Sequence, residues 1–233
     1  MKKIFYTVLG LFLLITLGSC SKDNNGSDTT SGTLEFNTAG SDAFIIDAEN
    51  ITATITLIAG GGGGAGGIGP SGGLSNSTGG GGGGGAGDII LLTDIDLTSN
   101  ANYIVTLGAG GLGGSINNAG ANGQNTIISL NNITLGSATA GSGGKSNTIG
   151  DNVGGNGGAG FPAGSKGTNG EFLDITWSGL AGDGGNGGDN GSDYGNGGAG
   201  GIGTAYNNTN PITGTNGNNG GTGYIKIEWR GKK

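Results

Sequence analysis

The sequence predicts an all-β protein in which short antiparallel strands support a glycine-rich lobe of packed polyglycine II helices. Three observations lead to this prediction. The chain of 233 residues contains 62 glycines and only 3 prolines. Short segments with apolar side chains alternate with a period of two, and long glycine tracts separate these segments from one another. No segment shows a helical period outside an N-terminal signal peptide.

The composition excludes several classes of protein. A collagen triple helix needs glycine at every third residue and about 15 to 20% proline, whereas glycines here are doubled and tripled. Only 11% of the residues are charged, which argues against disorder driven by charge. The net charge is -7 with a pI near 4.3, and the few cations are scattered. Because nucleic acid needs a basic stripe, we expect no nucleic-acid partner.

Residues 1–19 have the features of a secretory signal peptide. Lys2 and Lys3 precede a short apolar run that ends in small residues before Cys20, whereas a spanning helix needs about 18 or more apolar residues. The sequence LGSC at Leu17 to Cys20 resembles the lipobox of bacterial lipoproteins. This resemblance implies that Cys20 is lipidated and becomes the first mature residue. The alternative is an ordinary signal peptide with an incidental cysteine.

Residues 20–32 are polar and rich in turn-forming residues, which predicts a flexible tether. Lys22 and Asp23 resemble the short charged tag of surface-exported lipoproteins in some Gram-negative bacteria. Ser21 is not the aspartate that commonly retains lipoproteins in the inner membrane. We therefore expect a lipid-anchored protein of the outer membrane, exposed at the cell surface, with one glycine-rich β domain over residues 33–233.

Period-two alternation predicts the strands. It is clearest in ITATITLI at residues 51–58 and in YIKIEWR at residues 224–230. In both segments the apolar residues share one side, as in antiparallel sheets with one buried face. Weaker alternation predicts further strands over residues 33–37, 43–47, 88–97, 102–107, 125–130, 133–138 and 171–177.

Glycine tracts lie between the predicted strands, over residues 60–87, 108–123, 141–170, 179–203 and 214–223. They do not separate independent domains, because a single strand is not stable alone. Ordering glycine costs about 0.5 to 1 kcal/mol more than ordering alanine in regular structure, so the tracts need a compensating interaction. Left-handed extended helices with three residues per turn provide one. Without Cβ atoms they can pack side by side and pair their N–H and C=O groups.

Several junctions resemble the glycine-rich domain of phage tail-fibre adhesins and of many bacterial surface proteins. The most specific are the change from strand to polyglycine at Leu57 to Gly64, YIVTLGAGG at Tyr103 to Gly111, and GYIKIEW from Gly223. The resemblance covers about residues 42–229. It implies strands that support a sandwich of polyglycine II helices, with variable tips that contact receptors. The lipoprotein front end departs from a phage fibre, so the phage role does not transfer.

The residue types also limit the chemistry. The chain has no histidine, and its single cysteine is the predicted lipidation site. Catalysis by Ser/His or Cys/His pairs and histidine-ligated metals are therefore excluded, and we expect no enzyme and no cofactor. A carboxylate pair remains formally possible among Asp88, Asp94, Asp96, Glu171 and Asp174. The stretch GGNGGDNGS from Gly184 approaches a calcium-binding nonapeptide, which makes Asp183, Asp189 and Asp193 weak calcium candidates. Solvated turn aspartates are the favoured interpretation.

Four aromatic residues in or beside glycine tracts are candidate ligand contacts: Phe161, Trp177, Tyr194 and Tyr206. An aromatic at a loop tip can stack on a sugar or anchor a protein partner, and the alternative is that it covers the edge of a thin domain. The leading hypothesis is a non-enzymatic adhesion or binding module, held to the membrane by the lipid on Cys20, with a glycan or protein receptor. The alternatives are an ice-binding protein, because Thr52, Thr54 and Thr56 share one face, and a structural spacer without a ligand.

Overall fold

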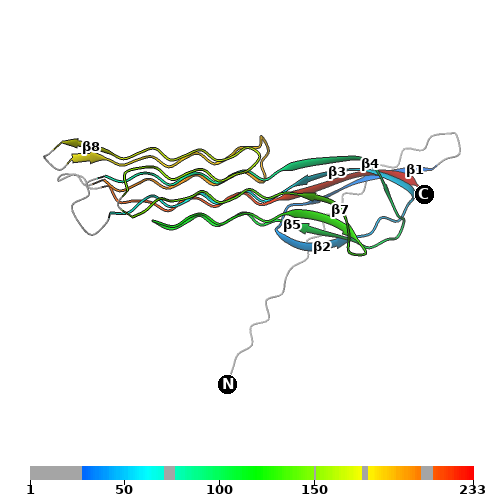
Figure 1. Ribbon diagram of the computed structural model, residues 1–233. Coiled ribbons are helices and arrows are strands. Elements are labelled where there is room, and N and C mark those ends of the chain that lie inside the picture. Colours follow the sequence, from blue (N-terminus) through cyan, green and yellow to red (C-terminus); the bar gives the residue numbers. More distant parts are fainter. Residues whose placement is uncertain (1–27, 71–76, 150, 175–177, 206–211) are drawn as a thin grey trace, which may run out of the picture.

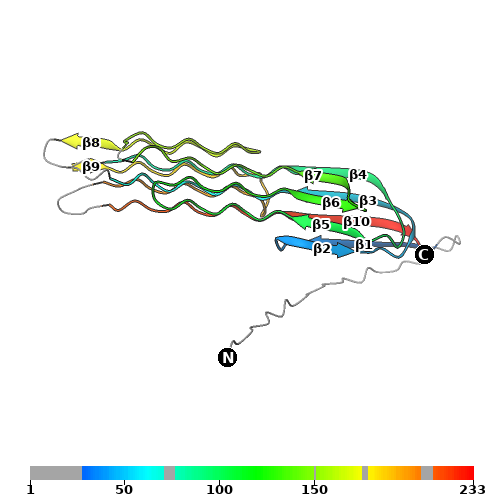
Figure 2. The same ribbon diagram turned by 60° about the horizontal axis from the view of Figure 1, so that its bottom comes forward.

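A computed structural model of the chain describes residues 28–70, 77–149, 151–174, 178–205 and 212–233. Two β-sheets form one end of an elongated molecule, and glycine-rich segments continue from the strands to the other end (Figures 1 and 2). The described residues contain no helix, which confirms the all-β prediction. The expected signal peptide, Cys20, Trp177 and Tyr206 lie outside the described residues.

The strands form two four-stranded antiparallel sheets and one hairpin. Sheet A has the order β1-β10-β3-β4, sheet B has the order β2-β5-β6-β7, and β8 pairs with β9. The strands are β1 Thr29–Phe36, β2 Gly40–Phe44, β3 Glu49–Ile58, β4 Ile89–Leu97, β5 Tyr103–Leu107, β6 Thr126–Leu130, β7 Ile133–Ala138, β8 Glu171–Asp174, β9 Ser178–Leu180 and β10 Tyr224–Lys232.

Sheets A and B pack face to face around an apolar core. Alternation places Ile55 and Leu57 of β3 on the same side as Ile227 of β10, and these face Val105 of β5 and Ile128 of β6. All five side chains are completely buried. Fully burying an aliphatic side chain stabilises a fold by about 1.5 to 3 kcal/mol. A small hydrophobic core of the ordinary kind therefore holds the two sheets together.

Each stretch that was predicted as a strand contains a strand, with three differences. β1 begins at Thr29, so the folded part starts inside the segment expected to be a tether, because residues 29–32 pair with the end of β10. At Gly32 a Cβ would lie 2.8 Å from Nε1 of Trp229, so a larger residue there would displace the indole. β2 lies at Gly40–Phe44, earlier than expected, and β9 is a three-residue strand without a readable alternation.

The glycine tracts form a bundle around two central segments, residues 60–68 and 79–87. Successive N–H groups rotate among three neighbours: Gly60 donates to Gln124, Gly61 to Gly221, Gly62 to Gly85, and Gly63 again to the first neighbour, at Ala121. Every third residue thus faces the same neighbour, which is the period of a polyglycine II helix. The segment also accepts hydrogen bonds from three further tracts, so six neighbours surround it.

Eight outer segments close a ring around the two central ones. Each is hydrogen-bonded to the next in the order 109–117, 118–124, 139–145, 153–160, 162–170, 182–188, 195–204 and 214–221, and the last returns to the first. The N···O distances in the ring are close to 2.8 to 3.0 Å, as at Ser142 to Ala159 (2.8 Å) and Gly167 to Gly155 (3.0 Å). The glycine tracts are therefore ordered and paired, as the packing argument predicts.

The position of each segment determines how much glycine it needs. In the central segments, a Cβ built on Gly63 would overlap the carbonyl oxygen of Leu112, and one on Gly83 would overlap that of Asn186. The outer segments keep glycine only where they face a neighbour, so Gly111 and Gly114 point inward while Leu112 is exposed. For this reason the longest glycine runs of the sequence, residues 60–64 and 79–85, lie in the central segments.

Candidate binding surfaces

The two ends of the described chain lie together, at the end of the sandwich that is opposite the bundle. The N–H of Lys233 donates to the carbonyl oxygen of Asp28 at 2.9 Å, and Thr29 pairs with Lys232. Figures 1 and 2 show the bundle projecting away from this point. We call the sandwich side of the bundle its near end and the opposite side its far end.

Tyr194 lies at the near end, in the bend that follows the segment 182–188. Its ring stacks on Tyr224 of β10 with centroids 4.5 Å apart and an interplanar angle of 10°. Tyr194 therefore holds a bundle turn against the outer face of sheet A, which is a packing role that the sequence did not reveal.

The stacking partner Tyr224 has a raised pKa of about 12. Burial is the main cause, followed by the charge of Glu35 and a hydrogen bond to that carboxylate.

Phe161 also lies at the near end. Its N–H donates to the carbonyl oxygen of Ala86 at 3.0 Å, three residues before β4 begins, and its side chain is 54% exposed. Neither Phe161 nor Tyr194 is thus at the far tip where the family resemblance would place receptor contacts. Of the four aromatic candidates, Trp177 and Tyr206 lie outside the described residues.

Three exposed apolar side chains lie at the far end on consecutive segments of the ring: Leu180 (51% exposed), Ile202 (40%) and Ile212 (42%). Backbone hydrogen bonds connect their surroundings. Gly203 donates to Gly182 at 2.8 Å, and Ala205 and Ile212 exchange bonds of 3.0 and 2.9 Å. We call these three residues the far-end apolar cluster. These residues carry no periodic signal in the sequence, because each is an isolated aliphatic residue in a glycine-rich or polar stretch.

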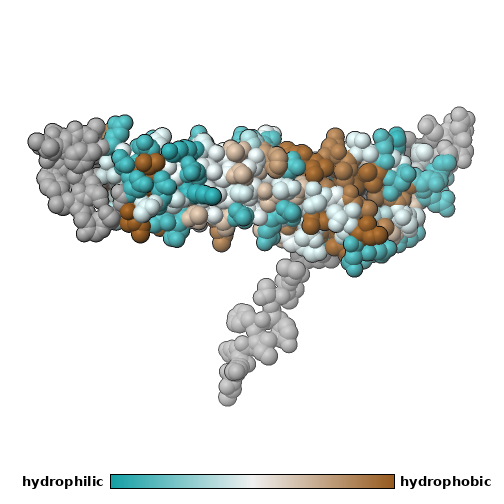
Figure 3. All heavy atoms as spheres, viewed as in Figure 1, coloured by the Kyte–Doolittle hydropathy of each residue, from teal (hydrophilic) through white to brown (hydrophobic). Residues whose placement is uncertain are grey.

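Most of the bundle flank is hydrophilic. In the view of Figure 3 the largest apolar area lies over the sandwich, whereas polar residues dominate the bundle. Some asparagines have a structural role: Oδ1 of Asn219 accepts the N–H of Gly113 at 2.8 Å, and Oδ1 of Asn122 accepts that of Gly143 at 2.9 Å. Each of these side chains pairs an N–H group that lies between the backbone hydrogen bonds of two neighbouring outer segments. Asparagine on the flank is thus not in itself evidence for a ligand.

The carboxylates do not assemble into one site. Asp183 and Asp189 stand at the two ends of the segment 182–188, six residues apart, which corresponds to about 19 Å in this helix type. Oδ1 of Asp189 accepts the N–H of Gly191 at 2.8 Å, within a turn. Among the described residues there is no group of three potential metal-ligating side chains. Glu171 and Asp174 lie on β8 at the far end, whereas Asp94 and Asp96 lie on β4 in the sandwich.

This architecture agrees with the comparison to known families. The family model for a glycine-rich domain matches residues 37–231. The chain belongs to this glycine-rich domain family. The match begins just after β1 and ends within β10, so it includes the other strands of both sheets and the segments of the bundle, but not β1. No curated protein matches the sequence. In the described part of this glycine-rich domain protein, no helix is long and apolar enough to cross a membrane.

Proposed function

We propose that this glycine-rich domain protein is a surface-tethered lipoprotein that acts as a non-enzymatic adhesion or binding module. A lipid on Cys20 would anchor it in the outer membrane, and the far end of the bundle would contact a glycan or protein receptor. The position of both chain ends at the sandwich supports this proposal. The described chain starts and finishes at the sandwich end, so an anchor on the N-terminal side leaves the bundle directed away from the membrane.

The bundle suits presentation of a binding surface at a distance. Its central segments of nine residues span about 28 Å at 3.1 Å per residue, and ring closure holds every segment to its neighbours along this length. The far-end apolar cluster supplies three exposed aliphatic side chains, and such side chains contribute to binding when a partner removes them from water. A rigid support lowers the entropy that is lost on binding.

The ice-binding alternative has less structural support. Thr52, Thr54 and Thr56 do share the outer face of β3, but charged side chains interrupt this face, because Glu228 pairs with Thr54 and Arg230 with Thr52. A regular flat array of hydroxyl groups is thus not present there. Measurable thermal hysteresis in a solution of the protein would nevertheless favour ice binding over adhesion.

Two experiments test the anchor and the exposure. Replacement of Cys20 by alanine is expected to abolish incorporation of a labelled fatty acid and to release the protein from the membrane fraction. Asn156 is an exposed position on the bundle, so Asn156→Cys is expected to react with a membrane-impermeant maleimide on intact cells. Reaction only after permeabilisation would overturn surface exposure. The Cys20→Ala, Asn156→Cys double variant controls for release of the protein.

Binding is tested by substitutions in the far-end apolar cluster. Cells that carry Leu180→Asn, Ile202→Asn and Ile212→Asn together are expected to lose attachment to a glycan array or to immobilised fibronectin, laminin and collagen. Leu112→Asn is the matched control, because Leu112 is 68% exposed on the middle of the bundle. Attachment by neither the wild type nor the variants would favour a structural spacer.

A further inference from the structure

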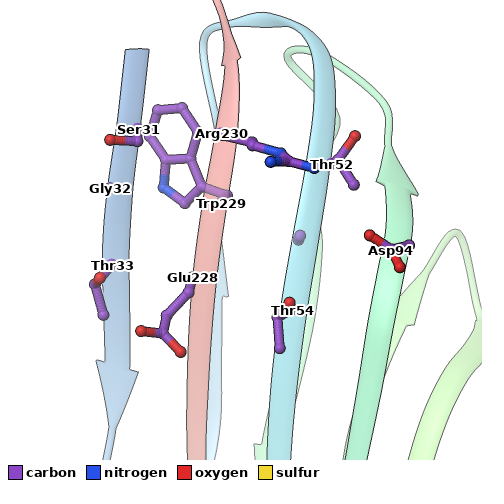
Figure 4. Close-up of a pocket in the computed structure, with 10 residues that line it drawn as sticks. Ser31, Gly32, Thr33, Thr52, Thr54, Asp94, Glu228, Trp229 and Arg230 are labelled. Atoms are coloured by element: carbon purple, nitrogen blue, oxygen red, sulfur yellow. The ribbon is translucent and has the colours of Figure 1, made fainter. Parts of the chain in front are cut away.

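A polar groove crosses the outer face of sheet A, which the proposed function does not use. It consists of two adjoining cavities of about 560 and 500 Å³ that share Ser31, Thr52 and Arg230. The larger cavity extends to Thr54, Glu228 and Asp94 (Figure 4). The smaller one extends toward Asn50 and Lys232 at the strand ends. From Asn50 to Thr54 the groove follows β3 for about 13 Å.

Strand register brings these side chains together. Ile55 of β3 and Ile227 of β10 point into the core, so the residues between the core positions point outward. Ser31 pairs with Arg230, and Arg230 pairs with Thr52. In the next outward row, Thr33 pairs with Glu228, and Glu228 with Thr54. Residues directly opposite one another have Cβ atoms about 5 Å apart, so each row forms a continuous polar strip.

A β-bulge supplies the side wall of the groove. The register between β3 and β4 shifts between Ala53 and Ile55, which leaves Thr93 and Asp94 opposite Thr54. Asp94 has a φ of 54°, a conformation that aspartate tolerates better than most residues. Bulges of this kind redirect a side chain, and Figure 4 shows Asp94 beside the groove, across β3 from Arg230.

The groups in the groove are suited to a ligand with many hydroxyl groups. Arg230 offers only hydrogen-bond donors, the carboxylates of Asp94 and Glu228 only acceptors, and the threonine hydroxyls both. Glu228 forms an ion pair with Lys226 at 2.9 Å, and no other ion pair is found among the described residues. The guanidinium of Arg230 and the carboxylate of Asp94 thus remain available on opposite flanks. Their opposite charges leave little preference for a charged ligand.

We infer that this groove binds a neutral oligosaccharide. Pockets for apolar molecules are lined mainly by hydrophobic side chains, whereas hydroxyl and charged groups line this groove. A sugar hydroxyl can donate to Asp94 or Glu228 while it accepts from Arg230. The site lies on the sandwich, so it is independent of the far-end apolar cluster and of the lipid anchor.

The test measures binding of maltotetraose, cellotetraose, xylotetraose and chitotetraose to the full chain by titration calorimetry and NMR. At least one is expected to bind. Arg230→Ala is expected to weaken that binding about tenfold or more, since hydrogen bonds to charged groups are the strong ones. Thr52→Val with Thr54→Val keeps the β-branched shape, removes two hydroxyl groups, and is expected to have a similar effect.

Thr106→Val is the matched control, because Thr106 is exposed on β5 of the opposite sheet, and it is expected to leave the affinity unchanged. Thermal unfolding identifies any groove variant that has lost the fold. Glu228→Gln, which changes the charge but not the shape of the side chain, then takes the place of that variant. Three results would overturn the inference: no binding of any of the four sugars, equal binding by wild type and groove variants, or binding of tetragalacturonate alone.

Discussion

The sandwich and the bundle are two solutions to the same requirement, that buried backbone groups be paired. In the sandwich, side chains such as Leu57 and Ile227 are buried and the backbone pairs within sheets. In the bundle, the central segments bury backbone with almost no side chain, and each N–H pairs with a different neighbour in rotation. The sandwich therefore depends on the hydrophobic effect, whereas the bundle depends on hydrogen bonds and close packing.

The largest loss of stability is expected when a large aliphatic side chain of the sandwich core is shortened. Leu57 is completely buried, so Leu57→Ala should lower the free energy of unfolding by about 2 to 5 kcal/mol, the usual range for such truncations. Chemical denaturation provides the measurement. Leu91→Ala is the control on the same sheet, because Leu91 is 60% exposed, and an equal loss there would contradict the assignment of the core.

In the bundle, the protein is expected to lose stability when a methyl group is added to a central glycine. Gly63→Ala places a Cβ on the carbonyl oxygen of Leu112, and overpacking of this kind costs about 1 to 3 kcal/mol. Amide hydrogen exchange should become faster across the bundle but stay slow in sheets A and B, if the two regions differ as described. The exposed control Asn156→Ala should leave exchange unchanged. Unchanged protection in Gly63→Ala would show that the central segment is less tightly packed than the structure indicates.

A smaller effect is expected at the asparagines that complete the outer ring. Asn219→Ala removes the acceptor for the N–H of Gly113 and should destabilise the protein by about 1 kcal/mol, the net value of a typical hydrogen bond. Its neighbour Asn218 uses its backbone carbonyl to bond Gly64, so Asn218→Ala is a closely matched control. Equal stabilities of the two variants would mean that water replaces the Asn219 side chain without loss.

The smallest effect concerns the contact between the two regions. Because burial and Glu35 raise the pKa of Tyr224 to about 12, the unfolded chain loses this proton at lower pH than the folded protein. The contribution of Tyr224 to stability is therefore complete below about pH 10, the ordinary tyrosine value, and is lost as the pH rises toward 12. Absorbance titration of the tyrosinate should show a late transition that is absent in Tyr224→Phe. A transition near pH 10 for every tyrosine would contradict this.

The comparison also explains what the sequence could predict. Alternation identified strands such as β3 and β10, because each buries one face only, and the cost of ordering glycine indicated that the tracts must pair. The sequence did not show that residues 60–68 and 79–87 are central, although their long glycine runs were the signal. A segment with six neighbours leaves little room for side chains, and the two central segments carry only those of Ala65, Ile68 and Ala86, whereas an outer segment has one or two directions open. Ring order, by contrast, depends on contacts between tracts far apart in the chain.

The candidate sites were harder to predict than the fold. Tyr194 looked like a tip residue, but its position depends on the stacking partner Tyr224, which is 30 residues away in the sequence. The groove on sheet A depends on the bulge at Asp94, and the pairing register that creates this bulge cannot be read from β4 alone. Both features arise from partners that only the folded chain brings together.

Closure of the ring has a consequence for how this domain can change over evolutionary time. Each segment is bonded to its neighbours at every third residue, so one segment cannot lengthen by itself without leaving unpaired backbone beside it. The reach of the bundle can therefore grow only in steps of one helical turn, about 9 Å, inserted in all ten segments at once. We expect bundle length to be inherited almost unchanged among relatives, while insertions and deletions accumulate in the connections at the far end.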